Sequence, residues 1–141
     1  MGLRRKSREL ALQFFFGHDF QGRSCDREEV SKEFSLFTKN FETGERSLPY
    51  AETIIMGLCE HWDEVDRLLA DHAHNWRMER MATVDRNLLR IAAWEMLYNH
   101  EVPRQVAINE ALEIAKRYSN PDAVGFINGI LDSLHAGMKK S

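Results

Sequence analysis

The sequence is poor in cysteine and lacks long apolar runs. Its only cysteines, Cys25 and Cys59, form no Cys-x-x-Cys pair and are too few for a disulfide scaffold, so we expect two reduced thiols. No apolar run approaches the roughly 20 residues that span a bilayer. The basic start also lacks the apolar stretch and cleavage site of a signal peptide. These absences predict a cytoplasmic protein without a membrane partner.

Proline is scarce, and each proline stands where a helix can begin. Pro49, Pro103 and Pro121 are the only three, and proline is well tolerated in a first helical turn. Apolar residues recur every three or four positions, with no alternating strand pattern, which predicts an all-α chain. The expected helices cover about 4–20, 25–39, 84–98 and 103–118, a last helix from residue 121, and either one long helix or two helices over 49–69 that meet near His61.

The residues that enzymes and metal sites require are also missing. His72 and His74 are two positions apart and diverge on a helix, and no Cys or His set has zinc spacing. The chain has no glycine-rich phosphate loop and no nucleophile elbow. We therefore expect a protein that is not an enzyme and that binds neither a metal nor a cofactor.

Positive charge is concentrated at the start of an otherwise acidic chain. The net charge is −3, yet residues 4–8 carry four cations ahead of the first acid, Glu9. Cations at a helix N-terminus oppose the helix dipole by about 0.3–1 kcal/mol each. An RNA backbone would supply the missing negative charge, and aromatic residues beside the cluster suit stacking of unpaired bases. The pattern predicts single-stranded RNA binding.

Several motifs occur in a specific order. They are Arg4-Arg5-Lys6-Ser7-Arg8-Glu9, Leu88-Leu89-Arg90-Ile91-Ala92, Val106-Ala107-Ile108-Asn109-Glu110-Ala111 and Phe126-Ile127-Asn128-Gly129-Ile130-Leu131-Asp132. This combination resembles the NusB family of bacterial transcription antitermination factors. The match is strongest over 84–134, whereas 24–48 and 61–80 carry no motif of the family.

The resemblance implies one RNA-binding domain over 1–141, made of two small helical bundles packed together, with subdomains of about 1–80 and 81–141. It implies binding of the boxA element of nascent RNA, notably ribosomal RNA, jointly with the ribosomal protein NusE within an RNA polymerase antitermination complex. The chain ends about where the catalytic domain of NusB-like RNA methyltransferases would begin, which again predicts no enzyme.

The resemblance also assigns site residues. The basic motif gives Arg4, Arg5, Lys6 and Arg8 as phosphate contacts, and Phe16 replaces a tyrosine common in relatives. On the surface shared by the partner and RNA, the matching positions are Glu79, Asp85, Asp122 and Phe126.

Other readings stay open for some of these positions. The helix dipole alone explains an acid such as Asp122 in a first turn. Gly125 stands where relatives often have lysine, which removes a cation. Asn109 and Asn128 are expected to be structural, tying their helices to neighbouring backbone. Glu95 lies within a nearly all-apolar segment and needs a partner that the sequence does not identify.

A second hypothesis is a helical interaction module that self-associates, including as a homodimer, without binding RNA directly. It depends on apolar residues that need not all be accommodated in a small core. These are Trp76, Met78, Met81 and Trp94.

Overall fold

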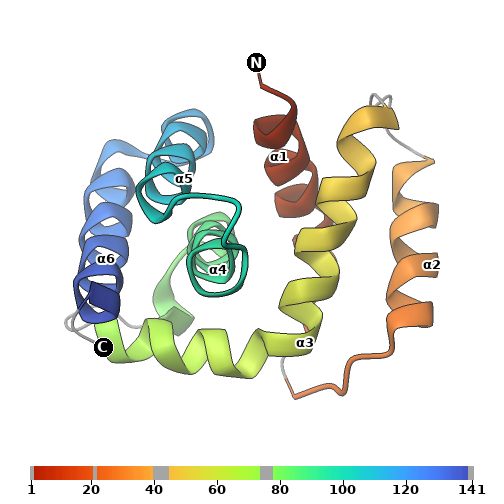
Figure 1. Ribbon diagram of the computed structural model, residues 1–141, viewed down its shortest axis with the longest axis horizontal. Helices are drawn as coiled ribbons and strands as arrows, with labels where there is room; N and C mark the ends of the chain where they lie inside the picture. Colours follow the sequence, from red (N-terminus) through yellow and green to blue (C-terminus); the bar gives the residue numbers. More distant parts are fainter. Residues whose placement is uncertain (1, 21, 40–44, 74–77, 140–141) are drawn as a thin grey trace.

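The computed structural model describes residues 2–20, 22–39, 45–73 and 78–139 (Figure 1). Within these ranges the chain forms six α-helices and two short 3-10 helices, η1 and η2, with no strand. The prediction of an all-α fold is confirmed. The elements are α1 (Leu3–Phe15), α2 (Arg27–Thr38), η1 (Glu45–Ser47), α3 (Leu48–His72), η2 (Met78–Arg80), α4 (Thr83–Tyr98), α5 (Arg104–Tyr118) and α6 (Pro121–Lys139).

The prolines mark helix starts as predicted. Pro49 lies in the first turn of α3, Pro103 is the N-cap of α5, and Pro121 is the first residue of α6. Before α6, the side chain of Asn120 accepts a hydrogen bond from the backbone N–H of Ala123 at 2.8 Å. This cap satisfies a donor that has no partner within the helix.

Helix α1 ends earlier than expected, at Phe15 instead of near Phe20. The chain turns at Gly17, and this turn brings Phe20 back into the core, where it is 3% exposed. There its ring packs edge-on against Phe15 and Trp62, at centroid distances of 5.9 and 5.3 Å. Burial of this aromatic ring favours the turn over continuation of the helix.

Helix α3 answers the question that the sequence left open at His61. Two helical segments meet at a kink at His61, whose backbone angles are non-helical (φ −128°, ψ 17°), as the two-helix alternative predicts. Figure 1 shows the first half beside α1 and α2 and the second half running toward α6. At the far end, Nδ1 of His72 lies 2.9 Å from Oγ of Ser133 on α6.

Helix α4 occupies the centre, as its apolar sequence predicts, and contacts α1, α3, α5 and α6. Figure 1 views it end-on between these neighbours. Helix α3 packs closely against it at Gly57, where a Cβ atom would overlap the indole of Trp94. The absence of a side chain at Gly57 therefore permits this packing.

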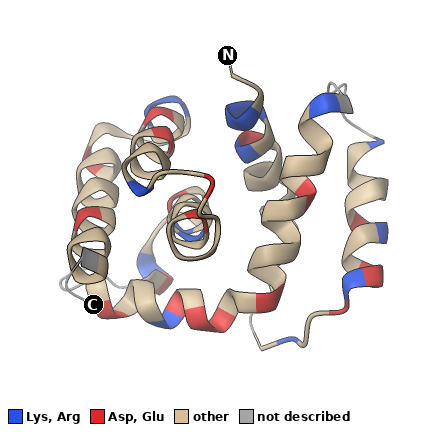
Figure 2. Cartoon of the chain, viewed as in Figure 1, with Lys and Arg blue, Asp and Glu red and all other residues tan. Residues whose placement is uncertain are grey.

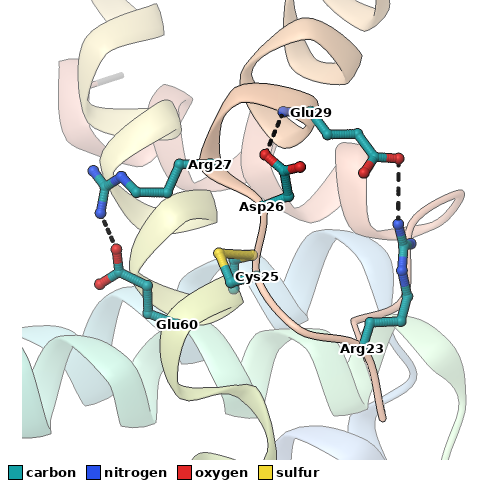
Figure 3. Close-up of a disulfide and its surroundings, with 7 residues drawn as sticks. Arg23, Cys25, Asp26, Arg27, Glu29 and Glu60 are labelled. Carbon is teal, nitrogen blue, oxygen red and sulfur yellow. Dashed lines mark hydrogen bonds and ion pairs between the residues drawn. A yellow bond between two sulfur atoms is a disulfide. The ribbon is translucent and has the colours of Figure 1, made fainter.

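The prediction of two reduced thiols is wrong in this structure, because Cys25 and Cys59 form a disulfide (Figure 3). The segment that enters α2 runs beside α3 and brings the two Cα atoms to 5.4 Å, within the usual range for a disulfide. The side chain of Asp26 caps α2 through the N–H of Glu29, at 3.2 Å. Sequence spacing does not reveal this proximity, since it arises from helix packing.

None of the described helices combines the length and the apolar character needed to cross a membrane.

Candidate nucleic-acid interface

The N-terminal end of α1 is basic and carries exposed cations (Figure 2). Arg4 and Lys6 are exposed and Arg5 is half-buried. Gly2, the N-cap residue, offers no capping side chain, and the first turn contains no acid. The positive end of the helix dipole and these three cations therefore reinforce one another.

Arg8 is not part of this surface, which corrects its assignment as a phosphate contact. Its side chain is 3% exposed, and its Nε donates to the two carboxylate oxygens of Glu95 at 2.9 and 3.0 Å. Glu95 on α4 is 1% exposed. The structure thus identifies the partner that Glu95 requires, and Arg8 is held in the core by a paired, hydrogen-bonded charge.

Glu110 of α5 connects two of the basic residues. It accepts hydrogen bonds from Nε of Arg5 at 3.2 Å and from Nη1 of Arg8, also at 3.2 Å. The hydrogen bonds from Arg5 raise the pKa of that guanidinium above its ordinary value. Arg4 lies 3.6 Å from Glu101, with both side chains well exposed. The protein therefore supplies part of the negative charge that we assigned entirely to a bound anion.

Tyr50 of α3 also contacts the residues around the basic end of α1. Its hydroxyl donates to Glu95 and accepts from Nδ2 of Asn99 at 2.9 Å, while the guanidinium carbon of Arg4 lies 5.1 Å from its ring centre. Burial, followed by the carboxylate of Glu95, raises the pKa of Tyr50 above its ordinary range. The neutral phenol and the cations thus hold the start of α1 against α3 and α4.

Phe16 lies exposed just after α1, as an RNA-stacking residue must. Its exposed fraction is 56%, whereas the adjacent Phe14 and Phe15 are buried. Phe16 also lines a pocket of about 270 Å³ between the end of α1, α3 and the start of α4.

Arg117 and Tyr118, at the end of α5, are two surface candidates that the sequence interpretation missed. Nη1 of Arg117 lies 2.8 Å from Oε1 of Glu9 on α1, and its guanidinium carbon lies 5.5 Å from the ring centre of Tyr118. Tyr118 is 41% exposed. An adjacent cation and aromatic residue was the available signal, but basic residues at a helix C-terminus are also expected from the dipole alone.

Of the four residues assigned to the partner surface, three are at least partly exposed and one is buried. Glu79 and Asp122 are exposed, and Phe126, one turn after Asp122 on α6, is half-buried against the core. Asp85 is 5% exposed and accepts a hydrogen bond from the hydroxyl of Ser119. Its carboxylate joins the start of α4 to the end of α5, which corrects its assignment as a contact residue.

Burial and hydrogen bonding bear on the expectation that Asn109 and Asn128 are structural. Asn109 is exposed and accepts from Nε2 of Gln105 on the same helix at 3.1 Å, so it does not tie α5 to a neighbouring backbone. Asn128 is half-buried. Gly125 is exposed, with open space where a side chain would lie.

Three of the four residues on which the self-association hypothesis depends lie in the core or pack against it. Met81 and Trp94 are buried, and Met78 packs partly buried against the core. Trp76 lies outside the described residues.

The sequence matches the model of the NusB family over residues 5–136. It is 42% identical over 137 residues to the transcription antitermination protein NusB of Trichlorobacter lovleyi, covering 96% of this chain and 92% of that protein. It is 47% identical over 133 residues to the same protein of Koribacter versatilis, covering 94% and 88%.

The fold is also similar to solved structures. One is T. maritima NusB, with a TM-score of 0.74, 34% identity and coverage of 93% of this chain and 89% of that one. Another is a structure of antitermination factors NusB and NusE in complex with dsRNA, with a TM-score of 0.74, 22% identity and coverage of 96% and 97%. The matches in sequence and the fold establish that this chain belongs to the NusB family of transcription antitermination proteins.

Proposed function

We propose that this chain binds single-stranded boxA RNA of nascent transcripts, notably ribosomal RNA, jointly with the ribosomal protein NusE. In this role it joins an RNA polymerase antitermination complex and performs no catalysis. The observation that carries the proposal is that α1, which is held against the core, carries the exposed cations Arg4 and Lys6 and is followed directly by the exposed ring of Phe16.

The RNA surface follows α1. Its basic end holds phosphates, and Phe16, about 18 Å along the helix axis, stacks on a base. Arg117 lies between these ends because it pairs with Glu9, in the middle of α1. The exposed pair of Arg4 and Glu101 contributes less than about 1 kcal/mol, so a phosphate can displace the carboxylate.

The partner surface uses Glu79, Asp122 and Phe126. The half-buried ring of Phe126 and the exposed carboxylate of Asp122 form an apolar contact beside an acid, which suits a basic ribosomal protein. A solved complex of the antitermination factors NusB and NusE with dsRNA has a similar fold and supports joint binding of NusE and RNA. We place both surfaces on a single domain over 1–141, with subdomains of about 1–80 and 81–141, acting in the cytoplasm where transcripts are made.

The test is binding of a labelled boxA-type RNA by the purified chain, with and without NusE of the same organism. The wild type should bind more tightly with NusE. Replacing Arg4 and Lys6 together by alanine should weaken RNA binding in both conditions, because two phosphate contacts are removed. Phe126→Ala should chiefly remove the gain from NusE.

Matched controls separate these effects from misfolding. Lys32→Ala removes an exposed cation that lies on α2 and not on α1, and it should leave RNA affinity unchanged. Equal losses for Phe126→Ala with and without NusE would show that this ring only supports the core. A double-stranded competitor that displaces boxA RNA as well as the single strand does would contradict single-strand recognition.

A further inference from the structure

The pocket beside Phe16 contains buried hydrogen-bond donors without acceptors. Only four buried side-chain polar atoms in the described part of the chain lack a hydrogen-bond partner, and three of them are N–H groups on residues lining this pocket. They are Nε1 of Trp62, Nε of Arg86 and Nδ2 of Asn87. The fourth, Oε2 of Glu33, lies 3.4 Å from Nε2 of His18.

Arg90 contacts two of these three residues, Asn87 and Trp62. Its Nη1 donates to Oδ1 of Asn87 at 2.8 Å, and its guanidinium carbon lies 4.2 Å from the ring centre of Trp62. Nε and Nη2 of Arg90 also bond both carboxylate oxygens of Asp66, at 2.7 and 3.0 Å. Because arginine only donates, the amide oxygen of Asn87 must face Arg90 and its NH₂ group is left for another acceptor.

Burial makes these donors costly to leave unpaired. Asn87 is 1% exposed and Trp62 is 3% exposed. A buried N–H without an acceptor loses its hydrogen bond to water and gains nothing in return. Three such groups from α3 and α4 around one pocket therefore match a ligand that presents oxygen acceptors.

Base edges differ in what they present to such donors. Uracil, like thymine, presents the O4 carbonyl where cytosine presents an amino group, and guanine presents O6 and N7 where adenine presents its N6 amino group. If an amino group faced these N–H groups, both sides would be donors and no hydrogen bond would form. The exposed ring of Phe16 at the same pocket offers a surface on which the base can stack.

We propose that this pocket receives the carbonyl edge of one RNA base stacked on Phe16, and that Trp62, Arg86 and Asn87 select uracil or guanine over cytosine or adenine. This inference rests on the proposed function, since it adds base selection to the same RNA surface.

Two substitutions remove a donor while keeping the surrounding contacts. Trp62→Phe removes the indole N–H and leaves an aromatic ring beneath Arg90. Asn87→Asp replaces the NH₂ group by an oxygen and keeps the acceptor for Arg90. Trp94→Phe is the matched control, because Trp94 lies two turns further along α4, is buried against Gly57 and does not line this pocket.

The experiment compares 12-residue oligouridylate with oligocytidylate, two pyrimidine strands of equal charge, by fluorescence anisotropy at one salt concentration. The wild-type chain should bind the uridylate about tenfold more tightly. Trp62→Phe and Asn87→Asp should each reduce that preference toward one, while Trp94→Phe keeps it. Thermal unfolding of each variant confirms that it is folded.

Equal binding of both strands by the wild type would overturn the base-selection inference and leave the proposed RNA binding intact. Retention of the full preference by both pocket variants would overturn it as well. If inorganic phosphate competes with either strand at this pocket and the strands bind equally, the donors hold a phosphate and not a base. Binding of neither strand, with or without NusE, would overturn the inference together with the proposed function.

Discussion

Nε of Arg8 on α1 lies 2.9 Å from Oε1 of Glu95 on α4, and both side chains are almost fully buried. This pair joins the helix that presents the RNA surface to the central helix of the fold. Glu110 and Tyr50 add hydrogen bonds from α5 and α3. The basic motif therefore has two parts, an exposed part that can contact phosphates and Arg8, which fixes the orientation of α1.

Arg8→Ala should lower the free energy of unfolding by about 3–5 kcal/mol, because it leaves the buried carboxylate of Glu95 without its cation. Arg4→Ala should change it by less than about 1 kcal/mol, since its pair with Glu101 is exposed. Urea unfolding of the two variants measures both values. Similar small losses in both would contradict a structural role for Arg8.

The position of Arg8 could have been found from the sequence. Ala11, Leu12 and Phe15 lie three, four and seven residues after it and are all buried, so Arg8 belongs to the inward stripe of α1. Its charge obscured this periodicity. The helix starts, by contrast, followed directly from the proline positions, because this signal acts within a few residues.

Other features depend on which helices meet and could not be predicted locally. The disulfide joins residues separated by 34 positions, and the burial of Asp85 depends on Ser119 of another helix segment. The kink at His61 occurs in the middle of a continuous apolar stripe, where periodicity supports both one helix and two. The donors of Trp62 and Asn87 converge only after α3 and α4 have packed.

Gly57→Ala should destabilise the protein by about 1–3 kcal/mol, because the added methyl group overlaps the Trp94 indole in a packed core. Gly125→Ala is the matched substitution on α6, where open space surrounds the position. It should stabilise the protein by about 0.5–1 kcal/mol through helix propensity. Denaturant midpoints compare them, and a tolerated Gly57→Ala would contradict the close approach of α3 and α4.

The hydrogen bond from the Tyr98 hydroxyl to Glu64 should make stability depend on pH. Burial, followed by this bond, raises the pKa of Tyr98 to about 12, and the bond lowers the pKa of Glu64. A tyrosine pKa is about 10 in the unfolded chain. The contribution of Tyr98 is therefore complete below about pH 10 and is lost as the pH rises toward 12.

Unfolding of the wild type and Tyr98→Phe at several pH values measures this effect. The stability difference between them should shrink between about pH 10 and 12. A difference that stays constant over this range would show that the Tyr98 hydroxyl is not bonded to Glu64 in the folded protein.

The disulfide should add to stability when it is formed. Closing a loop of 34 residues restricts the unfolded chain and is worth about 3–4 kcal/mol. Because a cytoplasm keeps most thiols reduced, the oxidised and reduced forms should be compared directly, with Cys25→Ser as the control that cannot respond to reductant. A melting temperature of the oxidised wild type that does not fall with reductant would contradict this contribution.

The salt dependence of boxA RNA binding tests the central claim most directly. Three phosphate contacts, from Arg4, Arg5 and Lys6, predict a slope of about −2 when the logarithm of the binding constant is plotted against that of the salt concentration. A fourth contact from Arg8 would make it about −3. The expected result is a slope near −2 in the wild type that changes to about −0.7, the value for Arg5 alone, when Arg4 and Lys6 are replaced by alanine. A slope near zero in the wild type would contradict recognition of RNA by the basic end of α1.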